Sequence, residues 1–167
     1  RYDEIIHNQM KGKTVINYIS SHDDGSPYDK NRENPWEAAT RLMLTPGMAQ
    51  IYYGDETARP LEVEGADGDA NLRSFMNCED IKPNSETLSL LNHFQKLGQF
   101  RNNHPAVGAG KQTQLQPNAF FRKYQDDEII IVLDAKTEKK VIDIKGLWSD
   151  GTKVRDAYSD KSTVVEN

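Results

Sequence analysis

The first strand-like segment of the chain is short and apolar, and it ends in a polar turn. Residues 14–19, Thr-Val-Ile-Asn-Tyr-Ile, are rich in β-branched side chains and almost continuous in hydrophobicity. This pattern favours a strand that is buried on both faces. The turn that follows, residues 20–25, reads Ser-Ser-His-Asp-Asp-Gly.

A helix is predicted after this turn. Asn34 is a candidate N-cap, Pro35 suits the first helical position, and Glu37 suits the positive end of the helix dipole. Apolar side chains recur at helical spacing at Trp36, Ala39, Leu42 and Met43. Pro46-Gly47 is expected to stop the helix.

A second short strand is predicted at residues 50–53, followed by another polar turn at residues 54–56. Strand, helix and strand with short joins form a βαβ unit, so the two strands should be parallel. The acidic turns at residues 22–24 and 55–56 then lie at the carboxyl ends of the strands, where α/β proteins place functional groups.

The rest of the chain divides into three parts. Residues 54–84 are polar and too long for an idle connection, so they form either a functional loop or an excursion with short elements of its own. A helix is predicted over residues 85–101, with Leu88, Leu91, Phe94 and Leu97 at helical spacing. We place a domain boundary after His104, which gives domains of residues 1–104 and 105–167.

The second domain is predicted to be an antiparallel sheet unit, part of a β-sandwich. Its strands are expected at residues 120–124, 128–133, 141–144 and 154–158. Its turns are expected at residues 126–127, 137–138 and 150–151. As a fragment, the chain is therefore of the α+β class.

Composition narrows the possible functions. The chain has 167 residues and a net charge of -5, with 21 basic and 26 acidic residues, and it has no basic block of the kind that binds nucleic acid. No apolar run approaches the roughly 20 residues of a membrane span. The single cysteine, Cys78, excludes an internal disulfide. The start at Arg1 has no signal-peptide pattern, and we expect either a cut inside a longer protein or a processed start.

The strongest candidate for chemistry is the pair His22 and Asp23 at the end of the first strand. A carboxylate there can stabilise developing positive charge or hold sugar hydroxyls, and the imidazole can donate to a substrate oxygen. The alternative is an ordinary turn with local side-chain to backbone hydrogen bonds. A metal is less well supported, because the four histidines show no ligand spacing and residues 67–69, which resemble the start of a calcium loop, lack its later Glu.

A second carboxylate is needed for most glycoside hydrolysis. Asp23 and Glu56 are one possible pair, but Asp55 and Glu56 could equally be a structural turn whose carboxylates cap backbone amides. Tyr52, Tyr53 and Trp36 could stack on sugars, although aromatic residues at such positions more often belong to the core.

Four segments, taken together, resemble the α-amylase family of glycoside hydrolases. Residues 18–23, Tyr-Ile-Ser-Ser-His-Asp, resemble the family's motif at barrel strand seven, and residues 45–56, Thr-Pro-Gly-Met-Ala-Gln-Ile-Tyr-Tyr-Gly-Asp-Glu, resemble its strand-eight motif. Residues 72–77 are similar to its Arg-x-Pro-Met stretch, and residues 97–106 to the end of its last barrel helix. Ser21, Ala49 and Phe75 depart from the commoner residues, which blurs the substrate specificity.

The resemblance implies the last βα units of a (β/α)8 barrel followed by the β-domain, because a complete barrel typically needs about 250 residues. It implies retaining hydrolysis of α-glucans such as starch. Asp23 would be the carboxylate that stabilises the transition state, and His22 would bind the same sugar. The nucleophile and the acid/base normally lie on earlier strands, so the chain alone should be inactive.

The resemblance also sets the expected partners. These are an α-glucan substrate, no nucleic acid, no membrane span, and self-association through exposed barrel edges. No cofactor is expected in this fragment, and calcium is possible in the full-length enzyme. An extracellular or periplasmic location is expected because polymeric glucans lie outside the cytoplasm. The alternative is a non-catalytic carbohydrate-binding or structural module; a His-Asp phosphohydrolase would need more His and Asp ligands.

Overall fold

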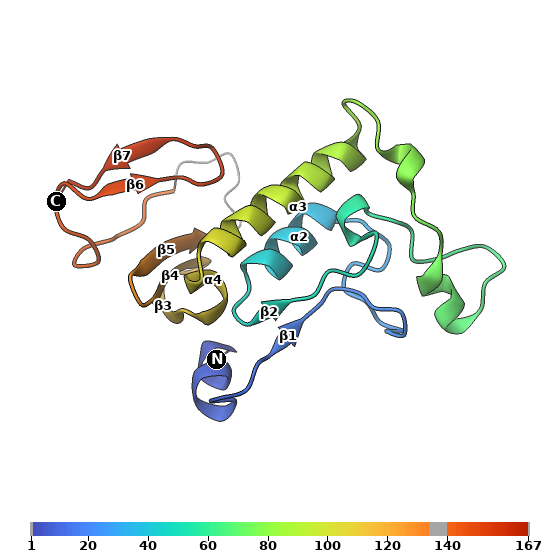
Figure 1. Cartoon of the computed structure of the whole chain (residues 1–167), viewed down its shortest axis with the longest axis horizontal. Coiled ribbons are helices and arrows are strands. Elements are labelled where there is room, and N and C mark those ends of the chain that lie inside the picture. The colour runs from blue at the N-terminus through green and yellow to red at the C-terminus, as the bar shows by residue number, and fades with distance from the viewer. Residues whose placement is uncertain (1, 134–139, 167) are drawn as a thin grey trace.

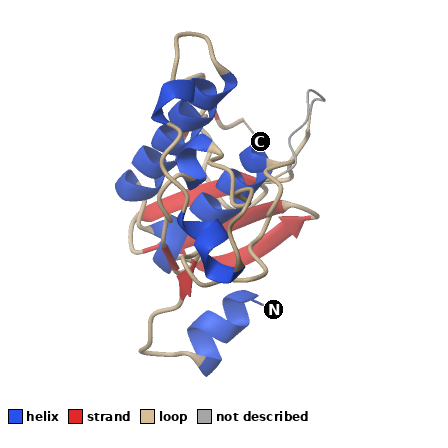
Figure 2. Ribbon diagram, turned by 90° about the vertical axis from the view of Figure 1, so that its right-hand side faces the viewer, coloured by secondary structure: helices blue, strands red, loops and turns tan. Residues whose placement is uncertain are grey.

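The computed structural model describes residues 2–133 and 140–166 (Figure 1). The chain begins with α1 (Tyr2–Glu4), which continues into a π-helical turn, η1 (Ile5–Gln9). Figure 2 shows this helical segment at one end of the molecule. Tyr2, Asp3 and His7 contact the remainder of the chain, and the Asp3 carboxylate accepts a hydrogen bond from the Gln112 backbone amide at 2.8 Å.

The predicted βαβ unit is present, with shorter strands than expected. β1 (Ile16–Asn17) and β2 (Met48–Ala49) come before and after α2 (Pro35–Leu44) in the sequence, and the two strands pair in parallel. The prediction of a strand at residues 50–53 was wrong in its position. The chain already turns at Tyr52, whose carbonyl accepts from the Asp55 amide at 3.0 Å.

Burial on both faces of the first strand was also a wrong prediction for this chain. Ile19 is buried, but Ile16 and Tyr18 are 53% and 49% exposed. The reason is that α2 and α3 (Glu86–Asn103) cover only one face of the strand pair. Alternate side chains of a strand point to opposite faces, so the second face stays open.

The main core lies between α2 and α3, which run side by side in Figure 1. Its buried residues are Ile19, Ala38, Ala39, Leu42, Met43, Leu90, Phe94 and Leu97. Each leucine buried in this way contributes about 1.5–3 kcal/mol relative to its exposed state. The helices therefore hold β1 and β2 in place from one side.

Residues 54–84 form an excursion with short elements of its own, one of the two predicted alternatives. Its elements are three 3-10 turns, η2 (Asp55–Thr57), η3 (Gly68–Arg73) and η4 (Cys78–Asp80). The Thr57 hydroxyl donates to Asn77 Oδ1 at 2.7 Å, and Asn77 Nδ2 donates back to the Thr57 carbonyl at 3.0 Å. This pair of hydrogen bonds closes the excursion against the end of β2.

The carboxyl-terminal part is antiparallel, as predicted. After a short helix, α4 (Ala106–Ala109), a three-stranded sheet contains β3 (Lys111–Gln116), β4 (Ala119–Tyr124) and β5 (Asp127–Val132), in that order. A separate hairpin contains β6 (Lys153–Arg155) and β7 (Ser162–Val164). The strands predicted at residues 120–124 and 128–133 are confirmed.

Two strand predictions in this part need correction. Residues 141–144 are irregular, because the Asp143 carboxylate accepts from the Lys145 amide at 2.9 Å and forms a local turn in place of strand pairing. Residues 154–158 are strand only up to Arg155, since Asp156 starts the turn to β7. The turn predicted at residues 137–138 lies outside the described residues.

Two arginines bind the carboxyl end of α2, Arg122 from the sheet and Arg101 from α3. Arg122 of β4 is buried and donates to the Leu44 and Val107 carbonyls, both at 2.7 Å. Arg101 of α3 donates to the carbonyls of Met43 and Thr45 at 2.8 and 2.9 Å. Both cations thus complement the negative carboxyl end of α2. Burial, followed by the nearby Arg101 charge, lowers the pKa of Arg122 to about 10.

Within the described ranges, no helix combines the length and apolar character needed to cross a membrane. The boundary after His104 stays a prediction.

Candidate functional site

His22 and Asp23 lie in the loop directly after β1, at the strand's carboxyl end. Their side chains are 65% and 62% exposed, and His22 Nε2 is 3.7 Å from Asp23 Oδ2. The Ser21 hydroxyl donates to Asp23 Oδ1 at 2.8 Å and accepts from the Asp23 amide at 3.4 Å. The local turn predicted as the ordinary alternative is therefore present, and it leaves one edge of the Asp23 carboxylate open to solvent.

Arg73 brings the excursion to this loop. Its Nε donates to the His22 carbonyl at 3.1 Å, and its Nη2 lies 3.8 Å from Asp69 Oδ2. Arg73 belongs to the segment 72–77 and His22 to the segment 18–23, so the structure brings together two of the motifs identified in the sequence. The backbone of the loop that contains His22 and Asp23 is therefore held by Arg73 of the excursion and by Ser21 within the loop.

Asp55 and Glu56 form a structural turn, as the second of the two sequence interpretations predicted. Asp55 is buried and its Oδ1 is 2.8 Å from Arg32 Nη2. The same oxygen accepts from the Ser20 hydroxyl at 2.6 Å, and Oδ2 accepts from the Tyr52 amide at 3.3 Å. Glu56 Oε2 accepts from the Gly54 amide at 2.9 Å. These carboxylates are engaged in holding the ends of β1 and β2 together.

A fully buried arginine, Arg59, lies behind this turn and was missed by sequence reasoning. Its guanidinium donates to the carbonyls of Tyr53, Leu72 and Ser74 at 3.1–3.2 Å. It also lies over the Tyr53 ring, 4.1 Å from the ring centroid. Arg59 is one of several charges in a polar stretch. The Arg59 side chain packs against Gly54, and this need for a glycine is the only sequence signal that could have indicated the burial of Arg59.

Tyr52 and Tyr53 are fixed by the same network. The Tyr52 hydroxyl donates to the Leu72 carbonyl at 3.1 Å, and the Tyr53 hydroxyl donates to the Ser74 carbonyl at 2.8 Å. Burial raises the pKa of Tyr52, and its contact with Tyr53 adds to this rise. Both tyrosines therefore support the excursion. Trp36, the third aromatic candidate, is 43% exposed and its ring lies 4.8 Å from that of His93.

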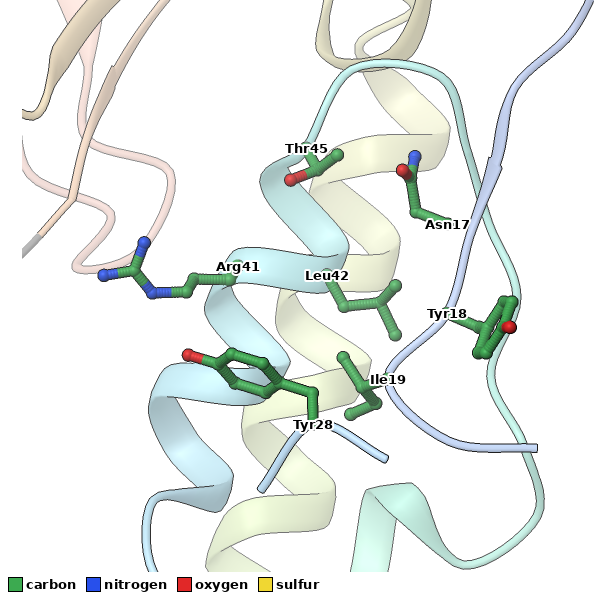
Figure 3. Close-up of a pocket in the computed structure, with 7 residues that line it drawn as sticks. All are labelled: Asn17, Tyr18, Ile19, Tyr28, Arg41, Leu42 and Thr45. Atoms are coloured by element: carbon green, nitrogen blue, oxygen red, sulfur yellow. The ribbon is translucent and has the colours of Figure 1, made fainter. Parts of the chain in front are cut away.

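An open hollow of about 200 Å³ lies between β1 and α2 (Figure 3). Ile19 and Leu42 point toward one another at its floor, and Tyr28 lies beside them. Its volume is below the 300–1,000 Å³ of typical ligand pockets. His22 and Asp23 are not among the residues that line it.

Calcium finds no suitable ligand set in the part of the chain that the structure describes. Within these residues, no three His, Cys, Asp or Glu side chains are gathered around one point. Asp69, from the segment that resembles the start of a calcium loop, faces the Arg73 guanidinium.

No family model matches the chain, but comparisons with known sequences and solved structures both find alpha-amylases. The chain is 41% identical over 127 residues to the periplasmic alpha-amylase of Escherichia coli, a match that covers 74% of this chain and 18% of that protein. An Anoxybacillus alpha-amylase has a similar fold, with a TM-score of 0.68 and 20% identity over 92% of this chain and 34% of its own. The AmyP E221Q variant, solved in complex with maltotriose, has a TM-score of 0.57 and 18% identity over 75% of this chain and 32% of its own.

Proposed function

The chain resembles the carboxyl-terminal part of α-amylase family glycoside hydrolases in sequence and in fold, and we propose that it supplies part of an α-glucan-cleaving site. It spans about a fifth of the Escherichia coli relative and about a third of the Anoxybacillus structure. The activity of such a protein as a whole is accordingly part of the proposal. The observation that carries it is the exposed His22–Asp23 pair at the carboxyl end of β1.

Asp23 is proposed as the carboxylate that stabilises the transition state. Glycoside cleavage passes through an oxocarbenium-like sugar, and a fixed negative charge next to that sugar lowers its free energy. The Ser21 hydroxyl, itself held by the Asp23 amide, donates to one carboxylate oxygen, and the other, 3.7 Å from His22 Nε2 on a side chain that is 62% exposed, would receive sugar hydroxyls. His22, with its backbone held by Arg73, would donate a hydrogen bond to the same sugar.

The chain alone is proposed to be inactive. Retaining hydrolysis needs a nucleophile and a proton donor in addition to the stabilising carboxylate. Asp55 and Glu56 lie in the turn after the second strand. Asp55 is paired with Arg32, and Glu56 accepts a hydrogen bond from the Gly54 amide. Loss of members of such a catalytic set costs about 10⁴–10⁶ in rate.

The finer architecture belongs to the same proposal. β1 and β2 would be the last two strands of a (β/α)8 barrel, and the antiparallel part would be its following β-domain. An extracellular or periplasmic location is proposed from the polymeric substrate and from the periplasmic relative. Calcium, if the longer enzyme uses it, would be bound outside the residues that the structure describes.

Inactivity is tested by reducing-sugar release from soluble starch by the purified chain. We expect no release above a heat-denatured sample. Turnover comparable to that of a complete α-amylase would refute the proposed division of the catalytic groups.

The binding role of Asp23 is tested by titrating the ¹⁵N-labelled chain with maltotriose at millimolar concentration. We expect amide shifts centred on residues 20–24, weakened by Asp23→Asn and unchanged by the neighbouring control Asp24→Asn. Cellotriose, with β-linkages, serves as the ligand control. Shifts confined to residues 111–132 would favour the alternative, a carbohydrate-binding module, and would contradict the role of Asp23.

A further inference from the structure

A buried histidine connects both main helices to the carboxyl-terminal hairpin. His93 of α3 is 8% exposed. Its Nε2 is 2.9 Å from the Thr40 hydroxyl on α2, and its Nδ1 is 2.6 Å from the Tyr158 hydroxyl. Tyr158 lies in the turn between β6 and β7, residues 156–161, which we call the clasp turn.

The hydrogen-bond network assigns one protonation state to His93. The Thr40 hydroxyl donates its only proton to the Trp36 carbonyl at 2.8 Å, so it must accept from His93 Nε2–H. Nδ1 is then without a proton and accepts from the Tyr158 hydroxyl. Neutral imidazole satisfies every partner. A second proton on Nδ1 would take away the acceptor of the Tyr158 hydroxyl proton, and that hydroxyl would have to turn away from the ring.

The charged groups around His93 do not compensate a positive charge on the ring. On α3, Lys96 donates to the Tyr158 carbonyl and its ammonium lies 4.6 Å from the centre of the Tyr158 ring. On the clasp turn, Asp156 accepts from the Tyr158 amide at 2.9 Å and the Ser159 hydroxyl at 2.5 Å. On α2, Glu37 and Arg41 pair with each other at 2.6 Å.

We propose that His93 is a pH-responsive clasp, which when neutral holds the clasp turn against α2 and α3 and when protonated releases it. The contacts of Tyr158 with His93 and Lys96 are the main polar attachments of this turn to the helices. The edge-to-face packing of Tyr158 on His93, with ring centres 5.5 Å apart, depends on the same position.

The direction of the pH effect follows from linkage. Burial lowers the pKa of His93 in the docked state, with a smaller opposing contribution from the Trp36 carbonyl. The released state therefore binds the proton more tightly. Docking is at full strength above the ordinary histidine pKa of about 6.5, weakens as the pH falls through that value, and reaches its minimum below the pKa of the docked state.

The test combines two measurements on the full chain. The ring signals of His93, followed by NMR, should show an Nε2–H tautomer at neutral pH and a pKa below the ordinary histidine value of about 6.5. Hydrogen exchange, corrected for intrinsic rates, should show protection of residues 153–164 falling at least about threefold between about pH 7.5 and about pH 5, while residues 119–132 stay protected.

His93→Gln and His22→Gln are the matched variants. Gln can donate to Thr40 but does not titrate near neutrality, so His93→Gln should remove the pH dependence at residues 153–164, and His22→Gln should leave it intact. Tyr158→Phe should lower protection of the hairpin at neutral pH. The proposal is overturned if His93 in the unmodified chain titrates at or above the ordinary histidine pKa of about 6.5, or if His93→Gln retains the pH dependence.

Discussion

Gly54 is the residue at which two independent constraints coincide. Its φ is +86°, and a Cβ placed there would lie 2.5 Å from Arg59 Nε. Gly54→Ala should therefore lower the free energy of unfolding by about 2–5 kcal/mol, the sum of left-handed backbone strain and overpacking. Gly68, at φ +54° with open space around it, is the control, and Gly68→Ala should cost only about 1 kcal/mol. Equal losses in urea unfolding would show that Arg59 simply moves aside.

The buried ion pair of Asp55 with Arg32 should contribute more to stability than the exposed pair of Glu62 with Lys30. Asp55→Ala leaves Arg32, whose side chain is 8% exposed, without its carboxylate, and should cost about 3–5 kcal/mol. Glu62→Ala breaks the pair with Lys30, in which both side chains are about half exposed, and should cost about 0–1 kcal/mol. Urea denaturation measures both. A small loss for Asp55→Ala would mean that water replaces the carboxylate at Arg32.

At the scale of elements, the two main helices begin in different ways. Ser85 accepts from the Leu88 amide at 3.0 Å at the start of α3, whereas Asn34 makes no side-chain cap at the start of α2. Asp29 accepts from the amides of Glu33 and Asn34 instead. Ser85→Ala and Asp29→Ala should each cost about 1 kcal/mol in thermal or urea unfolding. Asn34→Ala should change the free energy of unfolding by no more than about 0.5 kcal/mol. A larger loss would mean that the Asn34 side chain does cap α2.

The same scale explains what the sequence could predict. The helices α2 and α3 and the strands β4 and β5 were predicted because their apolar side chains repeat with the period of the element. β3 was missed because Lys-Gln-Thr-Gln-Leu-Gln has no apolar face, and this segment is strand only through its pairing with β4. The end of β2 was misplaced because the turn at Tyr52 depends on the distant partners of Asp55.

Some residues of the candidate site could likewise be placed from the local sequence, and others could not. His22 and Asp23 could be chosen as candidates, and placed after a strand, because that position is a local property of the sequence. Arg73, Arg32 and Arg59 could not be placed, because each has a partner 13 to 51 residues away along the chain. Charged side chains in a polar stretch carry no signal that separates a buried network from a solvated loop.

At the scale of the whole molecule, the open face of β1 and β2 is the feature that sets the chain's behaviour in solution. Ile16 and Met48 lie side by side in the pairing register and are 53% and 52% exposed, and Tyr18 shares their face at 49%. β2 takes its hydrogen bonds from the Val15 and Asn17 carbonyls, so the backbone groups of Ile16 and Tyr18 point away from β2, toward the edge. An apolar face next to an unpaired edge favours association between copies.

We expect the isolated chain to self-associate through this face, with sedimentation velocity showing a rising average mass from about 10 to about 300 μM. The double variant Ile16→Lys with Met48→Lys should remain monomeric over that range, because two ammonium groups oppose close approach of the faces. Val141→Lys is the control, since Val141 is 78% exposed in an irregular segment away from the strand pair. A chain that stays monomeric without substitution, or a control as effective as the double variant, would contradict the role of the open face. Either result would also weaken the proposal that β1 and β2 are barrel strands awaiting neighbours, because such strands must present a face that apolar partners can cover.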